Sequence, residues 1–268
     1  MSDLISTSTD GPVRTIRLNR PDKRNALNAA LVTALKTELR RAEEDPTRVL
    51  VLTGAGSAFS AGADLADLRA MRTAAPLDNE QDSRHLAGMF RQIYRHPKPI
   101  IAAVNGHAIG GGCGLAAVCD FSVVSTEAKL GFSEVRIGFV PAIVMVFVRR
   151  KVGETAARDL LLRGRLVGAE EAVDVGLFTE AVPPDRVADR ASERAKELAT
   201  ETSGSAVALT KRMLAQVPGM GFEEALDYAV QMNAFARGTE DCRAGIDAFL
   251  ADEDPPWKQS GADREGGE

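Results

Sequence analysis

Two short apolar runs, each followed within a few positions by glycines, constrain the fold of this chain more than any other feature. The first run covers residues 49–53 and the second covers residues 99–104. Apolar runs of this length, bounded by turn residues, are typical of buried strands. A helix of small residues follows the second run, and residues 121–124 form a third candidate strand. Strands that alternate with helices predict an α/β fold with largely parallel strand pairing.

The periodicity of apolar residues divides the chain into three parts. Residues 1–200 hold the strand runs and the helices between them, so we predict that they form the α/β core. Residues 201–251 repeat apolar side chains at helical spacing, which predicts a helical region. The last segment, 252–268, is rich in glycine and charge, and this composition predicts a disordered tail.

Local signals mark several element boundaries. Asn28 precedes a helical pattern and is expected to cap it, and Thr239 is expected to cap the last helix. Gly176 is expected to end a helix that begins near Ala169. Residues 66–92 are mostly polar, and we expect a mobile loop and a helix there.

The distribution of charge excludes several classes of function. The formal net charge is −5, and the segment 252–268, with six acids and two bases, carries −4 of it. The remaining body is close to neutral, so we expect no nucleic-acid partner. No segment approaches the roughly 18 uncharged apolar residues of a membrane span, and the N-terminus lacks the regions of a signal peptide. We therefore expect a cytoplasmic protein with no membrane partner.

Several common functional motifs are incomplete in this chain. A dinucleotide fingerprint would need glycine where Phe59 stands. Ser60 is a poor candidate nucleophile, because Ala58 occupies the first glycine of a nucleophile elbow. The three histidines are too scattered for a zinc site, so we expect no metal. The three cysteines, an odd number, favour buried free thiols over a disulfide.

Two glycine-rich turns can bring backbone N–H groups to one point. The first is Ser60-Ala61-Gly62-Ala63-Asp64-Leu65, and the second is Gly110-Gly111-Gly112-Cys113-Gly114-Leu115, which opens a helix. N–H groups at a helix start are unsatisfied and lie at the positive end of the helix dipole. Together the turns can donate to one oxygen, which is the geometry that stabilises an oxyanion. Close packing of a strand on a helix also requires small residues, so this alternative stays open for either turn alone.

A set of segments recurs along residues 10–250 in the order known from one enzyme family. The segments are Leu18-Asn19-Arg20-Pro21-Asp22-Lys23-Arg24-Asn25-Ala26-Leu27, residues 52–65, Lys98-Pro99-Ile100-Ile101-Ala102-Ala103-Val104-Asn105-Gly106, Gly110-Gly111-Gly112, Cys119-Asp120, Gly164-Arg165, Ala169-Glu170-Glu171-Ala172 and Gly176-Leu177. In these segments the chain resembles the crotonase (enoyl-CoA hydratase/isomerase) family.

The resemblance implies a fold, an assembly and a substrate. It predicts a crotonase-type spiral of ββα units with a C-terminal helical trimerisation region, in a homotrimer or a hexamer made of two trimers. It implies an acyl-CoA thioester as substrate, as in fatty acid metabolism. No further cofactor is expected, because coenzyme A is part of the substrate.

The resemblance also assigns residues to the site. The family's oxyanion hole falls on the N–H groups of Ala63 and Gly111, and its second catalytic glutamate falls on Glu134. The CoA adenine would lie against the backbone of residues 61–65, and the CoA phosphates would meet Lys23 or Arg24. The implied substrate-binding residues are Lys23, Arg24, Ala26, Ala61, Ala63, Asp64, Leu65 and Gly111.

The chain departs from the family at the first catalytic glutamate. Gly114 stands at that position, and the usual glycine-rich stretch after Pro141 is replaced by Ala142-Ile143-Val144-Met145. Glu134 would then act alone or with help from Asp64, Asp67 or acids of a loop at 78–82. Taken without the resemblance, Glu134 is more simply a surface or salt-bridged residue beside Arg136. If Glu134 is the base, an apolar site should raise its pKa.

Three functions remain compatible with this pattern. Similarity to one branch of the family favours a hydratase that adds water to a 2-enoyl-CoA, with a branched or methylglutaconyl-type substrate. A single carboxylate is also compatible with a Δ3,Δ2-enoyl-CoA isomerase. A non-catalytic acyl-CoA binder that kept the fold is the third possibility.

Overall fold

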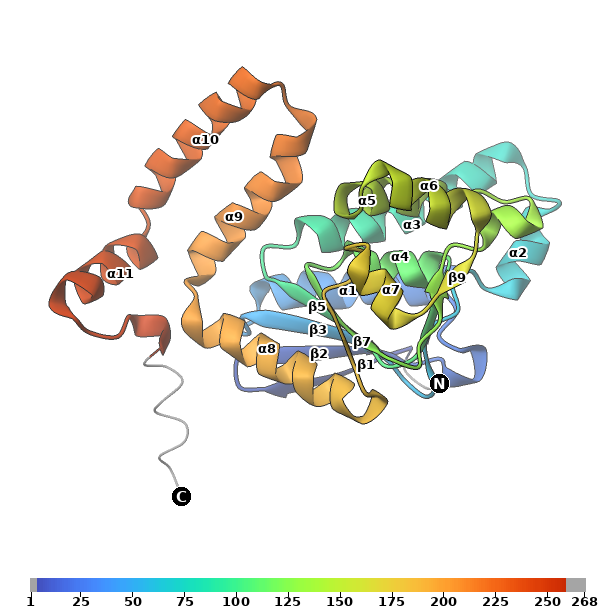
Figure 1. Ribbon diagram of the computed structural model, residues 1–268, viewed down its shortest axis with the longest axis horizontal. Coiled ribbons are helices and arrows are strands. Elements are labelled where there is room, and N and C mark those ends of the chain that lie inside the picture. The colour runs from blue at the N-terminus through green and yellow to red at the C-terminus, as the bar shows by residue number, and fades with distance from the viewer. Residues whose placement is uncertain (1–3, 259–268) are drawn as a thin grey trace.

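The computed structural model describes residues 4–258, and these form ten strands and eleven α-helices (Figure 1). The strands are β1 (Ile5–Asp10), β2 (Val13–Leu18), β3 (Val49–Gly54), β4 (Ala58–Ser60), β5 (Ile100–Val104), β6 (His107–Ile109), β7 (Phe121–Ser125), β8 (Leu130–Gly131), β9 (Leu166–Val167) and β10 (Glu180–Val182). The helices are α1 (Ala29–Glu44), α2 (Leu65–Met71), α3 (Pro76–Arg95), α4 (Gly111–Val118), α5 (Ala142–Lys151), α6 (Glu154–Arg163), α7 (Ala169–Asp174), α8 (Val187–Glu201), α9 (Gly204–Gln216), α10 (Phe222–Arg237) and α11 (Glu240–Ala251). Two 3-10 helices also matter for the site, η1 (Pro21–Lys23) and η2 (Glu134–Ile137).

The strands form two sheets. The larger sheet has the order β1-β2-β3-β5-β7-β10, and every pair in it is parallel except β1 with β2. The smaller sheet has the order β4-β6-β8-β9, in which β9 is antiparallel to β8. The largely parallel pairing predicted for the apolar runs is confirmed, because β3, β5 and β7 lie side by side.

The chain winds between the two sheets in a repeating pattern. β3 joins the larger sheet, β4 joins the smaller one, and helices α2 and α3 follow. The same sequence recurs as β5, β6 and α4, and again as β7 and β8 followed by α5 and α6. This succession is the spiral of ββα units that the family resemblance implied.

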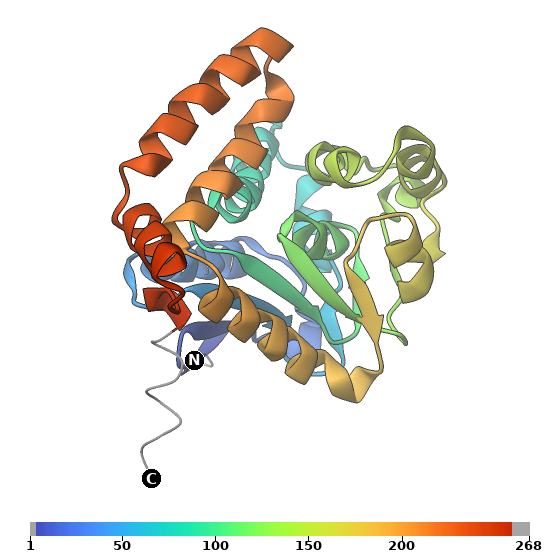
Figure 2. The same ribbon diagram turned by 60° about the vertical axis from the view of Figure 1, so that its left-hand side comes forward.

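The central strands of the larger sheet, β3, β5 and β7, are buried on both faces. A main apolar core surrounds one face and includes the inward side of α1, where Leu31, Leu35 and Leu39 recur at helical spacing. A smaller core lies between the other face and α8, which presents alanines at positions 191, 195 and 199. Small side chains at every fourth position let α8 approach the sheet closely (Figure 2). Strands covered on both faces read as continuous apolar runs, which is the pattern of β3 and β5.

The last three helices, α9 to α11, extend away from the body as an arm (Figures 1 and 2). Helix α8 ends at Glu201 and α9 begins at Gly204, next to the boundary expected at residue 200. Lys211 of α9 is buried, and its Nζ donates to the Asp120 carboxylate (2.6 Å) and to the Lys98 carbonyl (3.0 Å). This buried ion pair anchors the arm to the body.

The predicted tail falls partly inside the described residues. At 252–258 the chain turns back on α11: the Glu253 N–H donates to the Ala248 carbonyl (2.9 Å), and Lys258 pairs with Glu201. Residues 259–268 of the predicted tail lie outside the described residues.

Most local predictions are confirmed, and one needs correction. The Asn28 side chain accepts a hydrogen bond from the Leu31 N–H, and the Thr239 hydroxyl accepts one from the Cys242 N–H, so both cap their helices. All three cysteines are free thiols. The helix expected within 66–92 is confirmed by α2 and α3, but the loop expected beside it is restricted to residues 72–75. Among the described helices, none is both long and apolar enough to cross a bilayer.

Candidate active site

The two glycine-rich turns meet in space. The parallel pairing of β4 with β6 places them side by side, because one turn follows each strand. A Cβ placed at Gly62 would lie 2.5 Å from the Ile109 carbonyl oxygen and 3.3 Å from the Gly111 nitrogen. A Cβ at Gly112 would likewise lie 2.3 Å from the Ser60 carbonyl oxygen. Glycine is therefore required at both positions for the turns to come together.

The meeting point exposes two backbone donors. Within residues 4–258, neither the Ala63 N–H nor the Gly111 N–H donates a hydrogen bond to another group of the chain. Ala63 is exposed, and Gly111 is half-buried as the first residue of α4. The dipole of α4 adds partial positive charge at this end. Both N–H groups are thus available to donate to an oxygen, and their role as an oxyanion hole stays a prediction.

Pairing of β6 with β8 brings Glu134 to the same place. The Gly110 N–H donates to the Gly131 carbonyl (2.7 Å), and η2 begins three residues further on at Glu134. A Cβ at Gly110 would lie 2.9 Å from Glu134 Oε1, so the carboxylate lies directly against the start of α4. Gly110 adopts a left-handed φ of +54°, which favours glycine there independently of the contact.

The Glu134 carboxylate is only partly satisfied. Its Oε2 atom is buried and has no hydrogen-bond partner in the described part of the chain. Burial raises the pKa of Glu134 above its ordinary value, because desolvation disfavours the charged form. Arg136 does not pair with it, since its guanidinium contacts the Arg163 carbonyl. The alternative reading of Glu134 as a surface ion-pair partner of Arg136 is therefore wrong.

Position 114 holds no second carboxylate and has no space for one. A Cβ at Gly114 would lie 2.2 Å from Val144 Cγ1 and 3.3 Å from Phe90 Cε1. Val144 belongs to α5, which packs against α4. Val144 is one of the residues that stand in place of the family's glycine-rich stretch, and it fills the space beside Gly114.

Comparison with known proteins identifies the family. A sequence model of the family described as enoyl-CoA hydratase/isomerase matches residues 8–260. A Thermus thermophilus protein that carries the name of an enoyl-CoA hydratase is 44% identical over 246 residues, 91% of this chain and 97% of that relative. The 2,3-dehydroadipyl-CoA hydratase of Escherichia coli is 35% identical over 96% of this chain and 99% of its own length. A crystal structure of an enoyl-CoA hydratase from Mycobacterium smegmatis superposes with a TM-score of 0.90 at 30% identity, covering 96% of this chain and 99% of that one.

The chain belongs to the enoyl-CoA hydratase/isomerase family. It is therefore a member of an enzyme family, with the crotonase-type fold expected from its motifs. The family's name covers both reactions, and the family assignment leaves the choice between them open.

The other residues assigned from the enoyl-CoA hydratase/isomerase family lie around the first turn. Lys23 and Arg24 are exposed on η1 and directly after it, and the Arg24 carbonyl accepts from the Ala61 N–H (2.9 Å). Ala26 is buried, and its carbonyl accepts from Arg20 Nη1. Leu65 is the first residue of α2.

The acids considered as helpers for Glu134 lie on helices α2 and α3 or cap α2. Asp64 caps α2 by accepting from the Ala66 N–H (2.8 Å), and this bond together with the Arg20 ion pair lowers its pKa. Asp67 lies on α2, where burial and the nearby carboxylates of Asp64 and Asp82 raise its pKa. The acids at 78–82 belong to helix α3, so the loop expected there is wrong.

Two residues that hold the first glycine-rich turn in place were not assigned from the sequence. Asn25 is buried in a left-handed conformation, and its side-chain nitrogen donates to the carbonyls of Ala55 and Ala58. Arg20 bridges Asp64 and the Ala26 carbonyl. Both lie in the segment 18–27, so the motif itself was the available signal. Ser60, by contrast, is buried and donates to the Asn25 carbonyl (2.9 Å), which excludes it as an exposed nucleophile.

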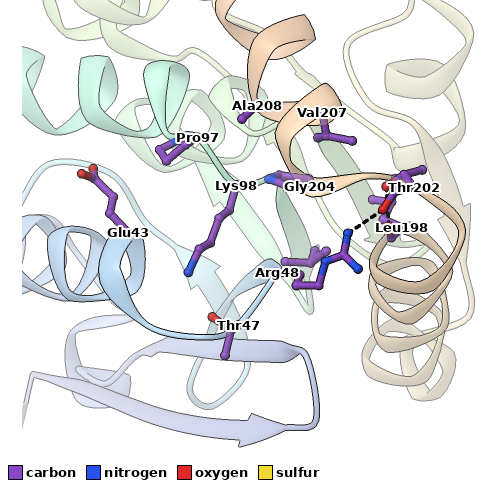
Figure 3. A pocket seen from close by; sticks show the side chains of 12 residues that line it. Glu43, Thr47, Arg48, Pro97, Lys98, Leu198, Thr202, Gly204, Val207 and Ala208 are labelled. Atoms are coloured by element: carbon purple, nitrogen blue, oxygen red, sulfur yellow. Dashed lines mark hydrogen bonds between the residues drawn. The ribbon is translucent and has the colours of Figure 1, made fainter. Parts of the chain in front are cut away.

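A pocket of about 240 Å³ lies elsewhere, between the body and the base of the arm (Figure 3). Its wall includes residues 47–49, which lead into the first residue of β3, and residues 97–99, which precede β5. It therefore lies at the amino ends of the strands, whereas the oxyanion turns follow their carboxyl ends. Arg48 extends across it to donate to the Thr202 carbonyl. This pocket belongs to the junction of the arm and not to the candidate active site.

Proposed function

We propose that this chain is an enoyl-CoA hydratase that adds water to a 2-enoyl-CoA through a thioester enolate. The observation that carries the proposal is the meeting of three groups: the unpaired N–H groups of Ala63 and Gly111 and the half-satisfied carboxylate of Glu134. The donors would hold the thioester oxygen. Glu134 lies beside that point, where a proton must move.

The chemistry follows from this placement. Water adds to C3 of the 2-enoyl group while negative charge develops on the thioester oxygen, where two fixed donors stabilise it. Glu134 takes a proton from the water and delivers one to C2, so that H and OH add across the double bond. A raised pKa suits this role, because a general base works best when its pKa lies near the working pH. The name of the Escherichia coli relative supports hydration of a 2-enoyl-CoA.

A second function, Δ3,Δ2-enoyl-CoA isomerisation, is favoured by one specific observation. Position 114 has neither a carboxylate nor room for one. A single base can remove a proton from C2 of a 3-enoyl-CoA and return it to C4, with the same two donors holding the dienolate. This reaction needs no bound water, so it requires no polar group beside Gly114 to hold one.

The family's coenzyme A contacts are proposed for the first turn. Lys23 and Arg24 are exposed cations beside the backbone of Ala61, and phosphate groups are the natural partners of such side chains. The backbone of residues 61–65 would meet the adenine. Branched or methylglutaconyl-type acyl groups are the proposed substrates.

We also propose that the arm assembles the chain into a homotrimer or a pair of trimers. The support is the apolar surface of the arm, since helix α10 buries none of its residues within the described chain. Large contiguous apolar surfaces mark association sites in soluble proteins.

Replacement of Glu134 tests the catalytic proposal. The variant Glu134→Gln keeps the shape of the side chain and removes the base, so kcat/KM should fall about 10²- to 10⁴-fold on the reactive thioester. Purified protein would be offered a 2-enoyl-CoA and a 3-enoyl-CoA, and the faster reaction would assign the function. Glu127→Gln, at an exposed position, is the matched control and should leave both rates unchanged.

Two outcomes would count against the proposal. Full activity of Glu134→Gln would exclude Glu134 as the base. Tight binding of an acyl-CoA by the wild type, with turnover of neither thioester, would instead favour the non-catalytic binder.

A further inference from the structure

Position 114 of helix α4 has no room for a side chain. A Cβ placed there would lie 2.2 Å from Val144 Cγ1 and 2.8 Å from Val144 Cβ, with Phe90 Cε1 at 3.3 Å. Carbon atoms in contact are normally about 3.5–4.0 Å apart. Val144 is 4% exposed and belongs to α5, which packs directly on α4. Val144 therefore fills the volume that a side chain at position 114 would need.

Position 114 also faces the site. It follows Gly111 by three residues and Gly110 by four, and residues at these spacings share one face of a helix. Gly111 carries one unpaired N–H, and a Cβ at Gly110 would lie 2.9 Å from Glu134 Oε1. The Cα–Cβ bond in a helix tilts toward the N-terminus, so a side chain at 114 would extend toward these groups. Val144 occupies that direction from the neighbouring helix.

We propose that Val144 is a specificity-determining residue, which seals the site next to position 114 and leaves Glu134 without a second carboxylate there. This inference rests on the proposed function. Val144 and Phe90 offer no hydrogen bond, so a water molecule on that side of the acyl group has no partner on the wall. Water that adds to C3 is then positioned by Glu134, and a polar group on this wall should raise the rate of hydration relative to isomerisation. Gly114 and Val144 act as one complementary pair.

The packing part of the proposal is tested without any substrate. The melting temperatures of the wild type, Gly114→Ala, Val144→Gly and the double variant form a thermodynamic cycle. Gly114→Ala should lower the melting temperature strongly when Val144 is present and only slightly when residue 144 is glycine. Soluble folding of the double variant where Gly114→Ala alone does not fold would give the same support. Equal effects of Gly114→Ala in both backgrounds would overturn the pairing.

The specificity part is tested by the ratio of hydration to isomerisation. In the Val144→Gly background, Gly114→Glu places a carboxylate on the wall, and Gly114→Gln is the matched neutral control. The glutamate variant should show a ratio roughly tenfold or more above the glutamine variant, because a positioned general base contributes at least this much. Val144→Thr keeps the shape of valine and adds one hydroxyl. It should fold and raise the same ratio several-fold.

The outcomes separate the specificity role from the proposed function. A wild type that turns over both thioesters, with the same ratio in the glutamate, glutamine and threonine variants, would overturn the role of Val144 alone. A wild type that turns over neither thioester would overturn the proposed function, and the role of Val144 with it. The thermal cycle reports on the packing in either case.

Discussion

Glu134 has a buried carboxylate oxygen with no partner among residues 4–258, and it lies where the proposed function needs a base. Because burial raises its pKa above the ordinary value of 4.5, the folded state favours the protonated form. The stabilisation from that form is complete below the unfolded pKa and is lost as the pH rises through the folded pKa. At neutral pH the ionised side chain is therefore a cost to the fold, which fits the trade between stability and activity at reactive sites.

A neutral substitute should remove this cost. We predict that Glu134→Gln melts at a higher temperature than the wild type at pH 7 to 8. The advantage should shrink as the pH falls toward 4.5 and be smallest below it, where both side chains are neutral in the folded and unfolded states. Melting curves of both proteins between pH 4 and 8 measure it. A glutamine variant that is no more stable at pH 8 than at pH 4, relative to the wild type, would contradict the prediction.

Gly110 is the residue on which the position of the base depends. Alanine at this position would combine left-handed strain at φ +54° with a Cβ only 2.9 Å from Glu134 Oε1. We predict that Gly110→Ala loses about 1 kcal/mol or more of stability and at least tenfold in kcat/KM, because the carboxylate must move. Misplacement by about 1 Å can cost roughly 10²-fold.

Gly176→Ala is the matched control for Gly110→Ala. Its φ is +79°, so the strain is similar, but a Cβ there would meet only the Lys151 carbonyl at 3.5 Å. The control should lose stability and keep its activity. Comparable activity in the two variants would show that the contact with Glu134 is unimportant. Urea unfolding and steady-state kinetics on both proteins provide the comparison.

At the scale of elements, a buried histidine joins the end of α1 to the start of β5. His96 is 1% exposed, its Nε2 lies 3.1 Å from the Leu39 carbonyl oxygen, and its Nδ1 accepts from the Lys98 N–H. Burial and the nearby charge of Lys211 lower its pKa from 6.5 to about 4. The folded state thus holds it neutral, and the stabilisation is present above pH 6.5 and lost as the pH falls toward 4.

Because of His96, we predict that the contact between α1 and β5 loses stability in acid. The shift corresponds to about 3 kcal/mol of folding free energy lost between pH 7 and 4. The variant His96→Gln does not titrate, so its unfolding free energy should fall by about 3 kcal/mol less over this range. Asp45 does not titrate in this pH range. Burial acts to raise its pKa, but hydrogen bonds from Lys98 and Thr47 outweigh this and lower the pKa to about 2. Parallel pH dependence of the two proteins, measured by urea unfolding, would contradict the assignment.

The elements that the sequence predicted are the long or strongly apolar ones. Strands β3, β5 and β7 are covered on both faces; β3 and β5 read as apolar runs, and β7 is apolar except for two serines. The smaller sheet was not predicted, because its strands have two or three residues and so show no period. Strand β1 was also missed, since five of its six residues are exposed and mostly polar, and only its pairing with β2 makes it a strand.

The site was predictable to the extent that motifs carry it. Ala63, Gly111 and Glu134 were placed from segment order, and the folded chain brings their three segments together. The contact between Gly114 and Val144 was not predictable, because thirty residues separate the two in sequence and only the packing of α5 on α4 joins them. The sequence shows that residues 142–145 differ from the family's glycine-rich stretch, but only the packing of α5 on α4 shows that Val144 fills the space beside Gly114.

At the scale of the whole molecule, the arm is the part that exposes many large apolar side chains to solvent. Helices α9 to α11 carry exposed large apolar side chains, among them Leu214, Phe222, Leu226, Val230, Phe235, Ile246, Phe249 and Leu250. Such a surface is costly to leave in water, at roughly 25 cal/mol per Å² of apolar area. Its anchors to the body are polar, through Lys211 with Asp120 and through Arg48 with Thr202. The arm is thus anchored to the body, while these apolar side chains stay exposed in the described part of the chain.

Charged substitutions on this face should separate the copies without unfolding the chain. Phe249 is 84% exposed and Phe235 is 61% exposed, so Phe235→Asp/Phe249→Asp removes little packing within one chain. Surface changes of this kind usually alter stability by about 0.5 kcal/mol or less, whereas an aspartate buried between copies is costly. We predict three or six chain masses for the wild type by light scattering and one for the double variant. Leu77→Asp, at an exposed apolar residue of α3, is the control and should keep the wild-type mass. An unchanged mass for the double variant would place the association elsewhere, while a monomeric wild type would leave the apolar face of the arm for a different partner.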